Sequence, residues 1–422
     1  MMYIIVSLGR YCYIICVLLF VGVCLPKFRI SWKTCEDRIE KVREHLVEND
    51  AKAMLLTNGL SVFYLTNFHH ITTERPAVLI VPDEGPLAFM GPLLEIDHLK
   101  HQTHLVQKVF TYLDYPGLVH PIDNFAKWMG ELGLDNGKLL ADNPRGATGA
   151  SGYVGSSLAD KLLDTSFESV GRYFYDRRLR KSEEEVALMR ESAKWGNLAH
   201  RYLQEFTAPG LWDAEVALMA SLEATSVMKK ALGPDFELFK GGRAASAGFR
   251  GQVGWKSAMP HCVSINREIE YGDVLVTGAG ASVGGYGSEL ERTMIVGEPS
   301  DKQRKLFNVM VKSQDASIEM LAPGNTCADV DKASRKVIID AGYGSLLRHH
   351  TGHGIGLQGH EPPYLDIGNP EVLEPGMVVT IEPGIYELGF AGFRHSDTAV
   401  ITEDGCELLT YYPRDIDSLT IY

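Results

Sequence analysis

The second half of the chain carries an internal repeat, and this repeat limits the folds that the chain can adopt. FTAPGLWDAEV (Phe206–Val216) returns as MLAPGNTCADV (Met320–Val330), with Ala-Pro-Gly, then Ala, an acidic residue and Val at matching positions. Each copy leads into a predicted helix and is followed by a histidine segment and a strand that starts at a glycine, Gly272 or Gly376. Two such units place their sheets side by side with helices outside, so a site is expected in the crevice between them.

The preceding part of the chain predicts a smaller domain. An amphipathic helix with Ile39, Val42 and Leu46 on one face is followed by short apolar runs that alternate with turns and helices. After residue 181 a long amphipathic helix with acidic residues in its first turn opens the second domain. We therefore predict a mixed α/β (α+β) protein with domains at 30–180 and 181–422, the second built on a pseudo-two-fold repeat.

Residues 1–29 form a separate apolar segment. Residues 11–25 are an unbroken apolar run between Arg10 and Lys27, which is short for a membrane span and has the length of a signal-peptide core. Three interpretations remain open: an upstream start codon with the protein beginning near Ile30, a membrane anchor at 3–25, or a cleaved signal. The first predicts a cytoplasmic protein, and the others predict an anchored or exported one.

Charge and cysteine content exclude several classes of protein. The formal net charge of −13 and the lack of a basic run argue against nucleic acid as a partner. The seven cysteines form no CxxC pair, so neither a disulfide framework nor a zinc knuckle is expected. A reducing compartment is the simpler interpretation.

The residues that can carry chemistry gather late in the chain. RHHTGHGIGLQGHEPPYL concentrates histidines among glycines, which is typical of a site rather than of a core. Glu382 lies between Ile381 and Pro383, where a desolvated carboxylate needs a cation or a metal. The candidates from these segments are His353, His360, Glu361, Tyr364, Glu382, Arg394 and, further upstream, His261.

The order of these motifs resembles a known superfamily. His261, GDVLVTGAG, SELERT, GHGIGLQGHE, MVVTIEPGIY and GFRHSDT follow one another as in the pita-bread superfamily of aminopeptidase P, prolidase, methionine aminopeptidase and creatinase. The resemblance covers residues 181–422. The small N-terminal domain is similar to that of the aminopeptidase P, prolidase and creatinase branch.

Carried over to this sequence, the resemblance implies an incomplete metal site. Of the five ligands that hold two divalent ions in the metal-dependent members, the first aspartate falls on Gly278 and the last glutamate on Ser396. The other three fall on Glu289, His353 and Glu382. We therefore expect either no metal or one divalent ion, and not a dinuclear centre.

Creatinase, the member that works without metal, offers the second comparison. The resemblance implies His261 as the acid–base residue, with Glu291, His353 and Glu382 as further site residues. Its carboxylate-binding arginine, supplied by the partner subunit, corresponds to Arg75, which implies a homodimer. This chain departs from creatinase at Tyr364, where creatinase has a second substrate arginine. The GHEPPYL segment resembles the peptidases instead, because it retains His360 and Glu361. Arg75, Arg394 and Tyr364 are the predicted substrate contacts.

Three functions follow from these observations. The first is an Xaa-Pro peptidase-like hydrolase of a small peptide, with Glu382 or Glu361 moving protons and His261 and His360 stabilising the oxyanion. The second is a metal-independent, creatinase-like hydrolase or lyase of a small carboxylated nitrogen compound, with Glu291 and Glu382 binding a cationic group. The third is a non-catalytic binding module of the same fold.

Overall fold

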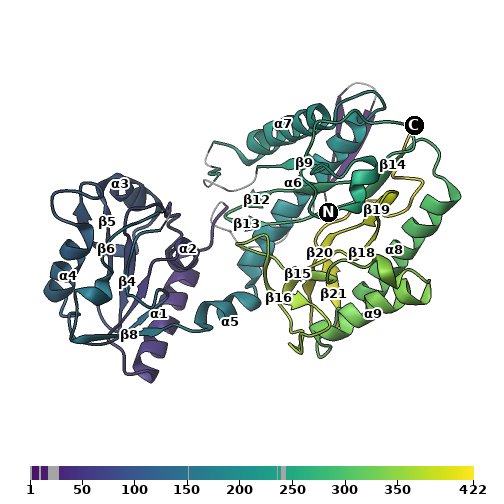
Figure 1. The fold of residues 1–422 in the computed structure, drawn as a ribbon. Coiled ribbons are helices and arrows are strands. Elements are labelled where there is room, and N and C mark those ends of the chain that lie inside the picture. The colour runs from purple at the N-terminus through teal and green to yellow at the C-terminus, as the bar shows by residue number, and fades with distance from the viewer. Residues whose placement is uncertain (1, 9–10, 18–27, 151, 235, 239–243) are drawn as a thin grey trace.

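The computed structural model describes residues 2–8, 11–17, 28–150, 152–234, 236–238 and 244–422 (Figure 1). Much of the expected apolar segment at 1–29, including 18–27, lies outside these ranges. Within it, β1 (Met2–Leu8) and β2 (Tyr11–Val17) pair in antiparallel orientation. Among the described residues, the helices are all too short or too polar to cross a membrane.

A six-stranded mixed sheet forms the N-terminal part of the chain, in the order β6-β5-β4-β3-β7-β8. Its strands are β3 (Ala53–Leu56), β4 (Val78–Pro82), β5 (Leu87–Pro92), β6 (Val106–Tyr112), β7 (Gly137–Ala141) and β8 (Thr165–Ser169). The associated helices are α1 (Trp32–Glu48), α2 (Gly59–Thr66), α3 (Leu93–Gln102), α4 (Pro121–Glu131), the 3-10 turn η1 (Leu158–Asp160) and α5 (Tyr173–Leu179). The predicted face of α1, with Ile39, Val42 and Leu46, is buried.

Two helix pairs and several small sheets form the C-terminal part. Its helices are α6 (Glu183–Phe206), α7 (Asp213–Leu232), α8 (Asp301–Glu319) and α9 (Cys327–Asp340), with 3-10 turns η2 (Gly254–Ala258) and η3 (Gly344–Leu346). Its strands are β9 (Ser246–Gly248), β10 (Val274–Val276), β11 (Gly278–Gly280), β12 (Ser282–Val283), β13 (Tyr286–Gly287), β14 (Thr293–Val296), β15 (Gly352–Gly354), β16 (Glu361–Leu365), β17 (Val378–Ile381), β18 (Gly384–Glu387), β19 (Ala391–Arg394), β20 (Asp397–Ile401), β21 (Cys406–Leu408) and β22 (Thr420–Ile421).

The helices of this part cover the strands from outside, as Figure 1 shows. α6 packs on β9 and β11, whereas α8 and α9 pack on β16, β17 and β19. The largest sheet has the order β16-β15-β17-β20-β21, and β10-β14-β22 forms a second sheet. Glu291 and Ser396 join the two halves through paired backbone hydrogen bonds of 2.9 and 3.0 Å.

The internal repeat is visible in the backbone. The glycines of the two Ala-Pro-Gly turns, Gly210 and Gly324, have φ angles of +87° and +92°. Gly272 and Gly376, which precede the corresponding strands β10 and β17 of the two repeats, have φ angles of +88° and +87°. Residues with a side chain rarely adopt this backbone conformation. The glycines that the two copies of the repeat share therefore occupy turns of the same shape. The mixed α/β class and the internal repeat predicted from the sequence are confirmed.

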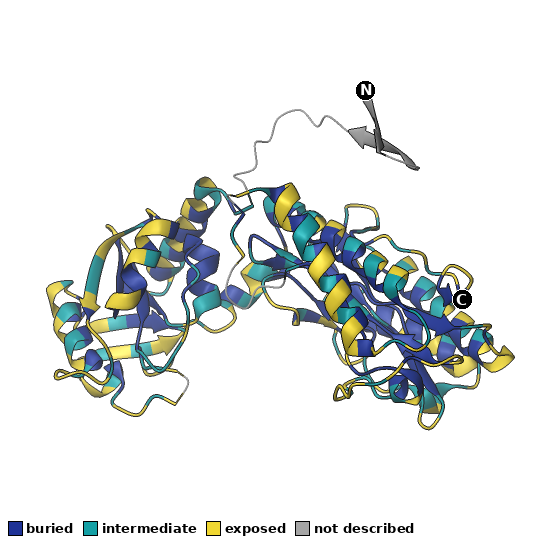
Figure 2. Ribbon diagram, turned by 90° about the horizontal axis from the view of Figure 1, so that it is seen from above, coloured by how far each residue is buried: buried dark blue, intermediate teal, exposed yellow. Residues whose placement is uncertain are grey.

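Figure 2 shows the two parts as two lobes, and one buried apolar cluster contains residues of both, such as Val42 and Val186. Ion pairs such as the 3.1 Å contact of Arg38 with Glu185 connect them. We propose the boundary at residues 180 and 181, between the end of α5 at Leu179 and the start of α6 at Glu183.

Candidate active site

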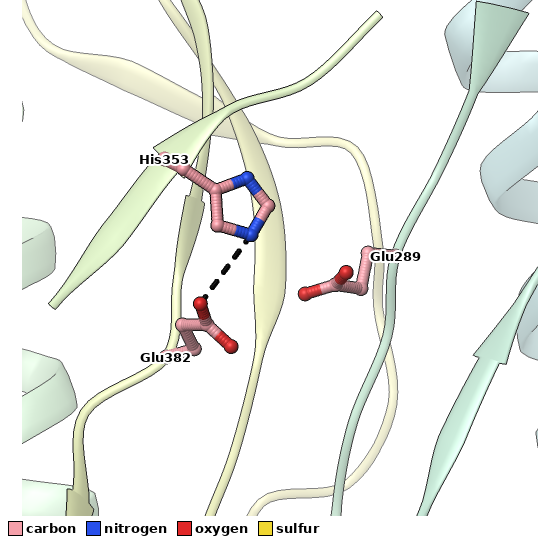
Figure 3. Close-up of side chains that lie close together, drawn as sticks. All are labelled: Glu289, His353 and Glu382. Carbon is pink, nitrogen blue, oxygen red and sulfur yellow. Dashed lines mark ion pairs between the residues drawn. The ribbon is translucent and has the colours of Figure 1, made fainter. Parts of the chain in front are cut away.

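Three side chains from separate segments of the chain meet in the C-terminal part (Figure 3). His353 is the middle residue of β15, Glu382 directly follows β17, and Glu289 precedes β14. One ligand atom of each lies within 4.8 Å of the others, and no other group of three metal-binding side chains meets this criterion among the described residues. We call these three residues the Glu-His-Glu cluster.

The glycines beside His353 allow the neighbouring backbones to approach it. A Cβ atom at Gly352 would lie 2.0 Å from the carbonyl oxygen of Thr380, and one at Gly354 would lie 2.2 Å from that of Pro362. Any other residue at either position would push the strands apart. The Gly-His-Gly sequence therefore keeps the His353 side chain fully buried in the sheet.

The surroundings of His353 fix its tautomer and its charge. Its Nδ1 lies 3.0 Å from the carbonyl oxygen of Gly354, so Nδ1 carries a proton and Nε2 points to Oε1 of Glu382, 3.3 Å away. Burial lowers the pKa of His353, but the contact with Glu382 and the charge of Glu289 outweigh burial and raise the pKa to about 9. For Glu382, burial raises the pKa, but His353 outweighs it and holds the pKa below its usual value. A cation at this cluster must therefore displace a proton.

Two further predicted histidines lie beside the cluster. The ring of His360 stacks on that of His353 with centroids 3.7 Å apart and planes at 19°. Burial and then the charge of His353 lower the pKa of His360, so its exposed ring is neutral at pH 7. His261 is exposed and close enough for its charge to act on His360.

Glu291, which was predicted to bind a cationic substrate group, instead binds two arginines of the protein. Its side chain is 1% exposed, and both carboxylate oxygens already contact guanidinium groups. Arg394 donates from Nη2 to Oε1 at 3.0 Å and from Nε to Oε2, and Nη2 of Arg250 contacts Oε1. Burial raises the pKa of Glu291, and the charge of Arg250 opposes that rise. The carboxylate is occupied by the protein itself.

Arg394 is likewise enclosed rather than available to substrate. Its remaining donors reach the hydroxyl oxygen of Tyr386 and Oε1 of Gln252, each at 3.2 Å. The residue is 3% exposed. Arg394 is therefore not placed to contact substrate as predicted. Its position instead allows it to hold the Glu291 carboxylate in place.

The two positions that break the expected five-ligand set have new neighbours. Ser396 donates a 2.9 Å hydrogen bond from Oγ to Oε1 of Glu289. Gly278 faces the Arg250 side chain, because a Cβ atom built on Gly278 would lie 3.3 Å from Nε of Arg250.

Glu361 follows His360 in the sequence but faces other partners. Its carboxylate lies 2.9 Å from Nζ of Lys181 and also contacts Arg178. Burial raises the pKa of Glu361, but Lys181 and then Arg178 outweigh it and lower the pKa. The structure thus gives Glu361 the position of a buried ion pair between β16 and the segment that joins α5 to α6, which does not suit the predicted proton transfer.

The other two predicted substrate contacts, Tyr364 and Arg75, lie in different parts of the chain. Tyr364 pairs with His353 in the register of β15 and β16 and is 40% exposed, so it borders the cluster. Arg75 belongs to the N-terminal part and pairs with Asp114, 2.6 Å from its Nε, and with Glu74.

Sequence reasoning missed Arg250, Gln252 and Tyr386. Gln252 and Tyr386 are fully buried and bind Arg394, and the Tyr386 hydroxyl also lies 2.8 Å from Nε2 of His349. The signal for Tyr386 was its place in TIEPGIY, and the signal for the other two was the polar FRGQ segment upstream of His261.

Comparisons with known proteins cover nearly the whole chain. A family model described as metallopeptidase family M24 matches residues 187–403, and one described as the creatinase/prolidase N-terminal domain matches residues 38–145. The uncharacterized peptidase YqhT of Bacillus subtilis is 31% identical over 90% of this chain and 99% of its own. The Xaa-Pro dipeptidase of Pyrococcus furiosus is 29% identical, with the same two coverages. The structure of the Xaa-Pro dipeptidase from Bacillus anthracis aligns with a TM-score of 0.74 and 30% identity over 92% of this chain and 100% of its own.

Proposed function

The chain belongs to metallopeptidase family M24, and we propose that this hydrolase cleaves the C–N bond before proline in a small peptide or peptide-like substrate. The proposal rests on one observation, the Glu-His-Glu cluster with His360 stacked beside it. Relatives named Xaa-Pro dipeptidase, which match this chain from end to end of their own sequences, support the substrate class.

The cluster suits one divalent ion and not two. Two carboxylates and an imidazole whose Nδ1 is already bound to a carbonyl oxygen are a sufficient ligand set for one ion. A second ion would need ligands at Gly278, which has no side chain, and at Ser396, whose hydroxyl binds Glu289. We therefore propose that Glu289, His353 and Glu382 hold at most one ion. Such an ion would polarise the substrate carbonyl and lower the pKa of water.

The protein groups around the cluster can handle the protons of hydrolysis. Glu382, ionised at pH 7, accepts a proton from the attacking water as the new C–O bond forms. The neutral imidazole of His360 donates a hydrogen bond to the oxygen on which negative charge develops. As the C–N bond breaks, Glu382 returns the proton to the departing nitrogen.

A second candidate function is favoured by Gly278 and Ser396. These two residues remove the ligands of a dinuclear centre, which supports a metal-independent, creatinase-like reaction on a small carboxylated nitrogen compound. In that reaction His261, which is exposed beside His360, carries the proton. Glu291 no longer serves as the receptor of a cationic group, because Arg394 and Arg250 occupy it.

A substrate screen with and without chelator separates these functions. Xaa-Pro dipeptides, longer peptides with proline second, and small amidino acids are offered to the chain in excess Mn²⁺ and in excess chelator. We expect chelator-sensitive release of proline or of the first residue, and a loss of about 10²–10⁴-fold in rate for Glu382→Gln. Glu387→Gln, which alters a glutamate paired with Lys302 on the surface, is the matched control. Turnover of an amidino acid alone, unchanged by chelator, would instead establish the second function.

We also propose a cytoplasmic location for the enzyme. The four cysteines that the structure describes in full, Cys35, Cys262, Cys327 and Cys406, are free thiols. Free thiols suit a reducing compartment.

A further inference from the structure

Arg250 has a backbone conformation that a residue with a side chain rarely adopts. Its φ angle is +51°, and Gly251 follows at +76°. The turn is closed by a 2.8 Å hydrogen bond from the amide of Gln252 to the carbonyl oxygen of Phe249. Non-glycine residues held in the left-handed region concentrate at functional sites, where the surrounding structure compensates for the strain.

This turn directs the Arg250 side chain over Gly278. A Cβ atom on Gly278 would lie 3.3, 3.4 and 3.5 Å from Nε, Cδ and Cζ of Arg250. The guanidinium group therefore begins where the side chain of an aspartate at position 278 would have to extend. A side chain at position 278 would therefore be in close contact with the Arg250 guanidinium, so the first expected ligand and Arg250 compete for the same space.

The positive charge of Arg250 also offsets the negative charge of the glutamates around the cluster. Its Nη2 contacts Oε1 of Glu291 and lies 3.3 Å from Oε1 of Gln252, and its positive charge acts on Glu289 and Glu382 as well. With all three glutamates ionised and His353 neutral, as metal binding requires, Arg250 and Arg394 leave a single net negative charge. That charge suits one divalent cation, whereas a second would leave the group strongly positive.

We propose that Arg250 is a tethered cation that takes the place of a second divalent ion in this site. The inference extends the proposed function, because it explains why the cluster accepts no more than one ion. The Arg250 side chain is 49% exposed, and among the described residues its Nε and Nη1 make no hydrogen bond. These donors are free to bind an oxygen atom of the substrate.

The first test measures Mn²⁺ affinity by calorimetry in the natural chain and in Arg250→Ala, Arg250→Lys and Arg178→Ala. Removing a positive charge beside three carboxylates should raise the affinity of Arg250→Ala by about tenfold or more. Arg250→Lys keeps the charge and should stay close to the natural chain. Arg178→Ala is a matched control, because it takes one of two cations from Glu361 as Arg250→Ala takes one of two from Glu291.

The outcomes of this test do not depend on turnover. A Mn²⁺ affinity of Arg250→Ala within about twofold of the natural chain would overturn the inference. An equal rise in Arg178→Ala would overturn it too, because the effect would then be general. Since only binding is measured, the result stands even where no Xaa-Pro substrate is cleaved.

The second test restores the missing ligands. Gly278→Asp with Ser396→Glu is prepared with Arg250 retained and with Arg250→Ala, and bound Mn²⁺ is counted by elemental analysis after dialysis. We expect a second ion only in the variant that lacks Arg250. Two tightly bound ions with Arg250 retained would refute the inference, and circular dichroism verifies that both variants are folded.

Discussion

Arg394 and Glu291 form a two-point ion pair that is almost closed to solvent, with side chains 4% and 1% exposed. Because Glu291 also pairs its backbone with Ser396, this contact fixes the first repeat against the second. Glu291 is therefore part of the support of the site, and its carboxylate is unavailable to a substrate.

Glu291→Gln should unfold more easily than the natural chain. A neutral amide leaves the buried guanidinium of Arg394 with only the more distant carboxylate of Glu382, whose Oε2 lies 4.0 Å from its Nε. Breaking one partner of a buried pair costs about 3–5 kcal/mol. Urea unfolding followed by circular dichroism measures the loss, with Glu387→Gln as a surface control expected within about 0.5 kcal/mol of the natural chain. Unchanged stability in Glu291→Gln would show that the carboxylate is not structural.

Much of this architecture could be predicted because its causes are local. The Ala-Pro-Gly turns and the glycines that start the paired strands are visible as a repeat, and Gly-His-Gly identifies His353. The sequence analysis gave Glu361 a role in proton transfer because it directly follows His360 in the sequence. Glu361 is the first residue of β16 and contacts Lys181 and Arg178, whereas His360 lies before the strand and stacks on His353. Adjacency in the sequence therefore separates these two residues in space.

Arg250 could not be predicted for a different reason. Its importance depends on the missing side chain at Gly278 in another strand and on a left-handed turn that its residue type does not favour. Neither condition leaves a periodic pattern in the sequence.

Ser396→Ala should weaken the binding of a divalent ion without removing a ligand. The Ser396 hydroxyl orients Glu289 through a 2.9 Å hydrogen bond, and losing such a supporting partner costs about 10–100-fold in metal affinity. Mn²⁺ titration by calorimetry measures the change. Ser396→Thr, which retains a hydroxyl, is the control, and equal losses in the two variants would assign the effect to altered packing.

The stability of the metal-free chain should fall on the alkaline side. The pKa of His353 is raised from 6.5 to about 9, so its contribution is complete below pH 6.5 and is lost as the pH rises through about 9. The loss over this window is up to about 3 kcal/mol for this buried group. Urea unfolding in chelator across the window measures it. His353→Gln should show a flatter profile, and an unchanged alkaline slope in that variant would assign the loss to other groups.

The affinity of the cluster for Mn²⁺ should rise with pH, whereas the stability of the metal-free chain falls. The ion binds the neutral imidazole, so it competes with the proton on His353 and its apparent affinity rises with pH up to about 9. A pH-independent Mn²⁺ affinity between pH 6.5 and 9 would exclude His353 as a ligand.

Arg75 provides the test of subunit cooperation. The resemblance to creatinase implies a homodimer in which this arginine reaches the partner's site, while within one chain Arg75 pairs with Asp114 and Glu74. Arg75→Ala and His353→Ala should each be inactive as homodimers, because one lacks the arginine and the other lacks the cluster. Mixed and reassembled in equal amounts, the two variants should recover about a quarter of the natural activity, since half of the dimers are mixed and each has one complete site. Light scattering verifies that the dimers form. If Arg75 serves its own chain, or does not serve the site, the mixture gains nothing over its separate components.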